Sequence, residues 1–345
     1  MRKKSVAQVE LLESKSQSVL REIMAGDPVR IALSILLGFI IGAIFMVVFN
    51  DGVVRAWSQF GSDPAYAFSS IWWTIQDGYG ALFSGSVYNL YSDNLIDGIR
   101  PLTETLRFAA PLIMAGLGVA LTFRVGLFNI GATGQIMMGL AGATFVSTRM
   151  ELPIVLHMLV AVFAAVLCAS VWGIIVGILK AKTGAHEVIV TIMLNYVATN
   201  FFTYLLREPS LLLEANGGGT PKSDKPADSA RLGTLFGSEF AVHYGLIIAI
   251  ISVVFYWWLM ERSTFGFRFR MVGHNASAAR SAGIKVETTF IWALAISAAF
   301  AGLAAANQGL STSGGLTTSI EAGIGFDAIT VALLGGSRAG GVVMA

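Results

Sequence analysis

The sequence predicts an all-helical, polytopic membrane protein with about eight transmembrane or part-transmembrane helices, some of them broken or re-entrant. Among its 345 residues, 55% are hydrophobic and 13% are charged, whereas a soluble domain carries about 25% charged residues. The mean hydropathy is +0.70. A chain with so little polar cover needs lipid as its solvent over much of its length.

The apolar residues fall into runs that match membrane spans. A spanning helix needs about 20 mostly apolar residues, and six runs reach that length: 29–49, 102–123, 152–179, 188–206, 242–260 and 290–309. Two weaker runs, at 125–148 and 326–345, are interrupted by glycines. Residues 5–24 have a weak amphipathic pattern, typical either of a helix on the membrane surface or of a solvated tail.

The distribution of basic residues predicts the topology. We expect a cytoplasmic segment at 1–28 and one transmembrane domain at 29–345. Alternating the spans from a cytoplasmic N-terminus puts 15 of the 23 Lys and Arg residues inside, as the positive-inside rule requires. The loops at 50–101 and 207–240 are then extracytoplasmic, and 261–289 is cytoplasmic. The first of these loops is rich in Trp and Tyr, which favours an interfacial helix near residues 71–90.

The sequence lacks the motifs that are typical of several functional classes, such as ATP-binding proteins and serine hydrolases. There is no G-x-x-x-x-G-K-[ST] phosphate loop and no G-x-S-x-G nucleophile elbow. The single cysteine, Cys168, and the four histidines form no metal-ligand pattern. A net charge of +2 predicts no nucleic-acid partner. Few charges lie deep in the spans, which suggests that another subunit supplies the energy for any transport.

The first candidate site is a broken segment that follows the predicted span at 102–123. The residues of this segment that could contact a solute are Phe128, Asn129, Gly131 and Gln135. A broken helix in a membrane is tolerated where protein buries it or where it lines a wet cavity. The two amides therefore either offer hydrogen bonds to a polar solute or bridge packed helices; the residues alone favour neither.

The second candidate site lies in the loop at 261–289. An Ala-rich helix is expected there, capped by Asn275 or Ser277 and ended by Gly283. Small side chains between basic residues suit a helix that docks into a partner. An ordinary basic loop is the alternative, but a short, capped, Ala-rich helix is more specific than the positive-inside rule requires, so docking is the favoured interpretation. The residues assigned to this docking segment are Gly273, His274, Asn275, Ala279, Arg280, Gly283 and Ile284.

Further glycines are expected to serve packing. A third glycine-rich segment at 323–336 enters an apolar helix, where a packing glycine is the favoured interpretation. The pairs Gly38/Gly42 and Gly173/Gly177 have the small-x-x-x-small spacing of close helix contacts.

Taken in this order, the segments at 126–135, 273–284 and 325–335 resemble the bacterial ABC permeases related to the ribose and branched-chain amino-acid importers, in particular the nucleoside and simple-sugar branch. The resemblance extends from residue 102 to the C-terminus. Many such permeases have Glu where this chain has Thr133, so a carboxylate role is not transferred to that position. The family continues for one or two spans beyond the third segment, so we expect an incomplete pore in a chain ending at Ala345.

The resemblance implies a transport subunit without enzymatic activity or a cofactor of its own. It implies a second, homologous permease, a cytoplasmic ATPase that binds ATP and Mg²⁺, and an extracellular substrate-binding lipoprotein, all at the bacterial plasma membrane. Residues 274–284 would form the coupling helix. Nucleosides are the expected substrate and ribose-type sugars the alternative. An ion-coupled transporter, a membrane-embedded enzyme and a scaffold stay open as other classes.

Overall fold

The computed structural model describes residues 28–208, 210–214, 221–237, 239–311 and 314–345. The amphipathic pattern at residues 5–24 lies outside these residues. The described elements are helices, apart from one isolated bridge between Leu213 and Ser223. This confirms the predicted all-helical class.

Five helices are long and apolar enough to cross a membrane, and they match five of the predicted spans: α5 (Leu95–Arg124), α7 (Ile154–Thr183), α8 (Glu187–Leu205), α9 (Gly245–Arg262) and α12 (Val286–Leu310). A sixth candidate is α2 (Pro28–Val48) together with α3 (Asp51–Ser58), which are bent by 62° at the break between them. The chain is therefore a polytopic membrane protein, as predicted.

The two weaker runs form shorter helices. The first becomes α6 (Ala132–Arg149), which begins only after the glycine-rich turn. The second is divided into α13 (Ile324–Leu334) and α14 (Ala339–Met344), so it is not one continuous pass. Gly336 and Ser337 have φ angles of +60° and +55°, and left-handed residues end a right-handed helix. With α6 and α13 counted as part-passes, the total agrees with the predicted eight.

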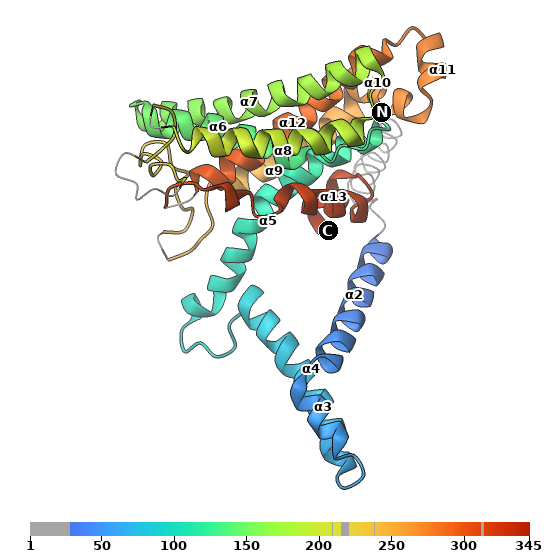
Figure 1. Cartoon of the computed structure of the whole chain (residues 1–345), viewed down its shortest axis with the longest axis vertical. Helices are drawn as coiled ribbons and strands as arrows, with labels where there is room; N and C mark the ends of the chain where they lie inside the picture. Colours follow the sequence, from blue (N-terminus) through green and yellow to red (C-terminus); the bar gives the residue numbers. More distant parts are fainter. Residues whose placement is uncertain (1–27, 209, 215–220, 238, 312–313) are drawn as a thin grey trace, which may run out of the picture. The chain divides into compact units, whose positions relative to one another are not determined.

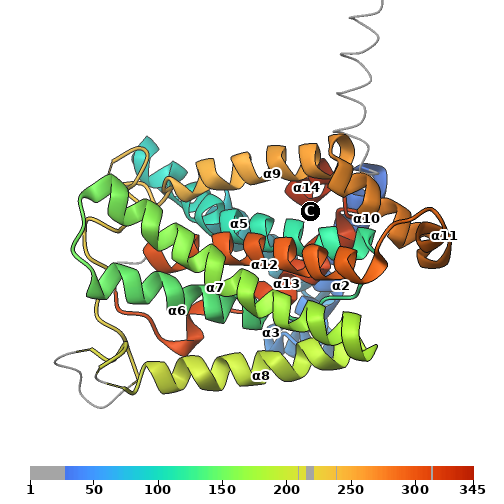
Figure 2. The same cartoon turned by 90° about the horizontal axis from the view of Figure 1, so that it is seen from above.

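The chain divides into two compact units, one formed by 108–233 and 243–345 and the other by 28–107 and 234–242. In the first unit, α6, α7 and α12 pack along their lengths (Figure 2). A Cβ added at Gly173 would lie 2.5 Å from the Leu294 carbonyl oxygen, and one at Gly177 would lie 2.8 Å from the Ile291 Cα. This pair therefore packs α7 on α12 as predicted.

The first unit has two distinct ends. The loop that follows α8 lies at one end of the bundle, and α10 (Thr264–His274) and α11 (Ala276–Ser281) lie at the other (Figures 1 and 2). The loop predicted to be outside and the loop predicted to be inside are thus separated by the length of the spanning helices. This is the arrangement that an alternating topology requires.

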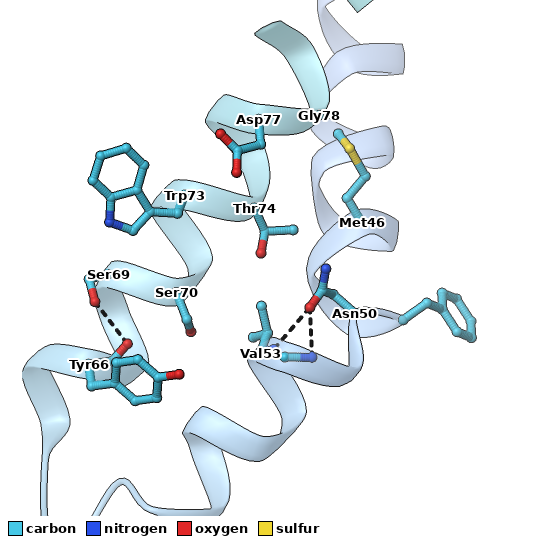
Figure 3. A pocket seen from close by; sticks show the side chains of 12 residues that line it. Met46, Asn50, Val53, Tyr66, Ser69, Ser70, Trp73, Thr74, Asp77 and Gly78 are labelled. Carbon is cyan, nitrogen blue, oxygen red and sulfur yellow. Dashed lines mark hydrogen bonds between the residues drawn. The ribbon is translucent and has the colours of Figure 1, made fainter. Parts of the chain in front are cut away.

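The second unit contains a pocket between α2–α3 and α4 (Pro64–Ser86), with a volume of about 880 Å³ (Figure 3). Helix α4 includes most of the helix expected near residues 71–90. The Asn50 side chain caps α3 by accepting hydrogen bonds from the backbone N–H groups of Gly52 and Val53. A Cβ added at Gly42 would lie 3.1 Å from the Tyr79 hydroxyl, whereas nothing lies within 4 Å of one at Gly38. Within the described residues, only Gly42 of the predicted pair therefore makes a close helix contact.

Candidate functional site

The broken segment starts where α5 ends at Arg124 and continues until α6 begins at Ala132. Gly126 has a φ angle of +81°, which lets the chain reverse immediately after the helix. Asn129 Oδ1 then accepts a hydrogen bond from the Gly131 N–H at 2.8 Å. The turn is therefore held by a side-chain bond that replaces the missing helical ones.

The two predicted amides are buried in the first unit. Asn129 Nδ2 donates to Ser297 Oγ on α12 at 3.3 Å and to Gln135 Oε1 at 3.5 Å. Asn195, on α8, accepts from the Gly134 N–H at 2.9 Å and donates to the Ile130 carbonyl at 2.9 Å. These bonds tie the start of α6 to α8 and α12, which is what the helix-packing alternative expects.

Two groups of the broken segment remain available for a further contact. Phe128 is 41% exposed and stacks on Phe123 with ring centroids 5.0 Å apart. Gln135 Nε2 is buried and has no hydrogen-bond partner in the part of the chain that the structure describes. A buried donor without a partner costs free energy, so a water molecule or a bound solute would satisfy it.

A buried carboxylate that sequence reasoning missed joins the two broken helices. Glu321 ends a short 3₁₀ helix, and its Oε1 accepts from the Gly325 N–H at 2.6 Å and from Thr133 Oγ1 at 3.1 Å. Its Oε2 accepts from the Gly323 N–H at 3.1 Å. The carboxylate thus lies where α6 and α13 both begin, at the positive ends of two helix dipoles.

The contact between these helix starts is close. A Cβ at Gly325 would collide with the backbone nitrogen of Thr133, which confirms the packing role predicted for the third glycine-rich segment. The signal for Glu321 in the sequence is a single acidic residue two positions before Gly323. The position that is often Glu in similar permeases, Thr133, donates to a carboxylate here.

The predicted docking segment forms the expected helix. Asn275 Oδ1 accepts from the Ala278 N–H at 3.0 Å and caps α11, as predicted. Gly283 has a φ angle of +83°, and the Ile284 N–H bonds back to the Ala279 carbonyl at 3.0 Å. This is a helix stop of the Schellman type. Arg280 pairs with Glu287 at 2.7 Å.

The exposed face of α11 differs from the predicted one. Ala279 is buried against its own chain, so its small side chain does not face a partner. The side chains exposed on α11 include Ser277, Ala278 and Ser281. Of the other residues assigned to docking, Ile284 is half-buried, and those that are exposed are Gly273, His274, Asn275, Arg280 and Gly283.

The two candidate segments touch each other. A Cβ at Gly273, near the end of α10, would collide with the Arg124 carbonyl oxygen, and a Cβ at Gly126 would lie 3.5 Å from the Gly273 Cα. Glu261 pairs with Arg124 at 2.5 Å and with Arg270 at 3.4 Å. The start of the broken segment therefore packs backbone to backbone on the last turn of α10, shortly before α11.

These features define a polytopic α-helical membrane protein whose broken helices meet inside its core and contact a capped helix at one end of the bundle. The chain belongs to the ABC permease family described as "Branched-chain amino acid transport system / permease component", which matches residues 102–345. It is thus a permease subunit of an ABC importer rather than a catalytic subunit, which agrees with the resemblance seen in the sequence.

Three curated relatives show how far the similarity extends. The chain is 38% identical to the guanosine ABC transporter permease protein NupP of Bacillus subtilis, over 79% of this chain and 76% of the relative. It is 34% identical to the glucose ABC transporter permease protein TsgB13 of Haloferax volcanii, over 78% and 70%. It is 30% identical to the nucleoside ABC transporter permease protein NupB of Lactococcus lactis, over 91% and 79%. No solved structure matches the chain.

Replacing Glu321 tests the junction of the two helices. Glu321→Leu would leave three donors without their acceptor, and each unsatisfied buried donor costs about 1–3 kcal/mol. We expect a fall of several degrees in the thermal unfolding midpoint of the purified protein. Glu321→Gln keeps one acceptor oxygen and should lose less. Glu287→Gln, at an exposed carboxylate, is the control, and a Leu variant as stable as this control would contradict the role of Glu321.

Proposed function

We propose that this chain forms part of the translocation pathway for nucleosides in an ATP-driven importer. The observation that carries the proposal is the similarity to permeases of guanosine and nucleosides, which covers 79% and 91% of this chain. Ribose-type simple sugars are the second candidate, and the similarity to a glucose permease at 34% identity favours them. Membership in the ABC permease family argues against ion coupling as the source of energy.

The broken segment supports a solute pathway through the first unit. Phe128 offers an exposed ring, and stacking of a base on an aromatic ring contributes about 1–3 kcal/mol in nucleic-acid binding. The Gln135 amide nitrogen is a buried donor without a partner among the described residues, and a sugar hydroxyl would satisfy it. Asn129 and Gly131 shape the turn between these two side chains. A solute reaches Gln135 only when α6 and α12 separate, which suits a route that opens and closes.

The exposed stripe of α13 also supports this pathway. Phe326, Asp327, Thr330 and Leu333 are exposed on this helix, although it belongs to the apolar part of the chain. A carboxylate facing lipid is costly. The stripe therefore suits a face covered by water or by another protein, as expected at a pathway shared with a second permease.

The relatives suggest that the second permease is a different chain. Two guanosine permease proteins of Bacillus subtilis, NupP and NupQ, are similar to this chain at 38% and 26% identity. Two glucose permease proteins of Haloferax volcanii, TsgB13 and the putative TsgC13, likewise differ in their identity to this chain, which is 34% for the first and 27% for the second. We propose that this chain corresponds to the more similar member of such a pair and assembles with a homologous permease.

The remaining parts of the importer follow from this assignment. An ABC permease works with an ATPase and a substrate-binding protein, and we propose that the ATPase holds ATP and Mg²⁺ while this chain needs no cofactor. The binding protein is an extracellular lipoprotein. Helix α11 docks on the ATPase, and the adjoining α10, through the contact of Gly273 with Arg124, carries the movement to the broken segment. The protein lies in the bacterial plasma membrane with its N-terminus in the cytoplasm.

Uptake measurements test the solute. In cells that contain the whole importer, Phe128→Leu removes the flat ring and should lower uptake of radiolabelled guanosine about fivefold to a hundredfold. Phe145→Leu is the matched control, because Phe145 is 42% exposed on α6. Ribose uptake should be absent or much slower in all strains. Transport of ribose without guanosine would replace the nucleoside assignment by the sugar one.

A charge on α11 tests the docking. Ala278→Glu places a carboxylate on the exposed face without disturbing the buried Ala279. An unpaired charge buried in an interface costs several kcal/mol, so the ATPase should no longer co-purify while the permease still inserts. Thr183→Glu, at the exposed end of α7, is the control. Full recovery of the ATPase with Ala278→Glu would show that α11 does not dock.

Cysteine labelling tests the orientation. Ser277 and Asp228 are exposed at opposite ends of the first unit, which makes both suitable probes. In a Cys168→Ser background, a membrane-impermeant thiol reagent added to intact cells should modify Asp228→Cys and leave Ser277→Cys unmodified. The reverse pattern would place α11 outside the cell and exclude a cytoplasmic docking helix.

A further inference from the structure

A second pocket lies beside the turn that follows α11. It has a volume of about 550 Å³ and is lined by α10, the turn after α11 and the first turns of α12. Its polar side chains include Arg268, Lys285 and Thr288, and its aromatic wall is formed by Phe265, Phe269 and Trp292. A pocket with two cations and an aromatic wall suits an anionic group that has an apolar body.

Among the residues that the structure describes, no acidic side chain neutralises the two cations of this pocket. Within the part of the chain that the structure describes, Arg268 and Lys285 form no ion pair, whereas the neighbouring Arg270 and Arg280 pair with Glu261 and Glu287. Glu287 is the acidic residue of the first turn of α12, and Arg280 offsets its charge at 2.7 Å. The pocket therefore carries a net positive charge.

The helix that forms one wall adds to this charge. Helix α12 begins at Val286 without a side-chain cap from Lys285, and the Glu287 carboxylate interacts with its own backbone N–H. The positive end of the helix dipole therefore lies at this wall of the pocket. Lys285 and Thr288 lie at this helix start, and the exposed Thr288 hydroxyl adds a donor. Cations, a hydroxyl and a helix N-terminus are together the groups that bind phosphate.

The aromatic wall is typical of a site at the level of lipid headgroups. Trp292 and Phe265 are 49% and 42% exposed and contact each other edge to face, with centroids 6.4 Å apart. They lie near the ends of spanning helices, where Trp and basic residues gather at the membrane–water interface. Basic pockets between such helix ends bind the headgroups of anionic lipids.

We propose that this pocket binds the phosphate of an anionic membrane lipid such as phosphatidylglycerol. Arg268, Lys285 and Thr288 bind the phosphate, and Phe265 and Trp292 pack on the glycerol and the first methylenes of the acyl chains. Gly283 and Ile284, which end α11, form part of the same pocket. A bound lipid therefore holds the turn after α11 in place. This site depends neither on the identity of the transported solute nor on which end of the bundle is cytoplasmic.

Native mass spectrometry of the purified importer tests the site, with phosphatidylglycerol and the zwitterionic phosphatidylcholine as probes. The double variant Arg268→Gln/Lys285→Gln should weaken binding of phosphatidylglycerol about thirtyfold, since each basic residue near an anionic membrane contributes about a factor of five. Thr288→Trp fills the pocket without removing a cation and should give a similar loss. Lys182→Gln, an exposed cation at the end of α7, is the control and should bind as the unmodified protein does.

Three results would overturn the proposal. Unchanged binding of phosphatidylglycerol in both pocket variants would place the lipid elsewhere. Displacement of the lipid by inorganic phosphate at comparable concentration would make the pocket a site for free phosphate. Unchanged lipid binding with loss of the ATPase from the double variant would make it a protein contact. Because lipid binding is measured directly, its failure is distinct from a failure of the nucleoside assignment.

Discussion

Every backbone N–H and C=O group inside a bilayer has to find its hydrogen-bond partner within the protein, and this constraint governs the broken helices of this chain. An unbroken helix meets it by itself, whereas α6 and α13 begin inside the bundle and leave their first N–H groups without helical partners. Asn129, Asn195 and Glu321 supply those partners. Buried polar side chains thus supply the partners at these two helix starts.

Close glycine packing gives these helix starts a mechanical connection to the end of the bundle. The turn after Arg124 packs directly on the backbone of Gly273, near the end of α10, because Gly273 has no side chain to separate them. Gly325 packs on the backbone of Thr133 for the same reason. Packed backbones deform little and tend to move together. The end of α10 is therefore packed rigidly on the turn at which the broken segment begins, and Gly325 is packed in the same way on the start of α6.

The same bundle offers different chemistry at different depths. Near the helix breaks, the described groups are mainly neutral amides, hydroxyls and one carboxylate held by N–H groups, which suits the passage of an uncharged polar solute. Near α11, the groups are basic and aromatic, which suits contact with lipid headgroups and an acidic or polar partner. This division follows from the cost of charge at the centre of a bilayer and its small cost at the interface.

The sequence by itself determined the class, the apolar spans, the capped helix α11 and the family, because run length, capping residues and glycine-rich motifs are local signals. It did not locate Glu321 between two helix starts, the burial of Ala279 or the division of residues 326–345 into two helices. Only the tertiary structure decided these points, because side chains from segments up to 188 residues apart supply the partners.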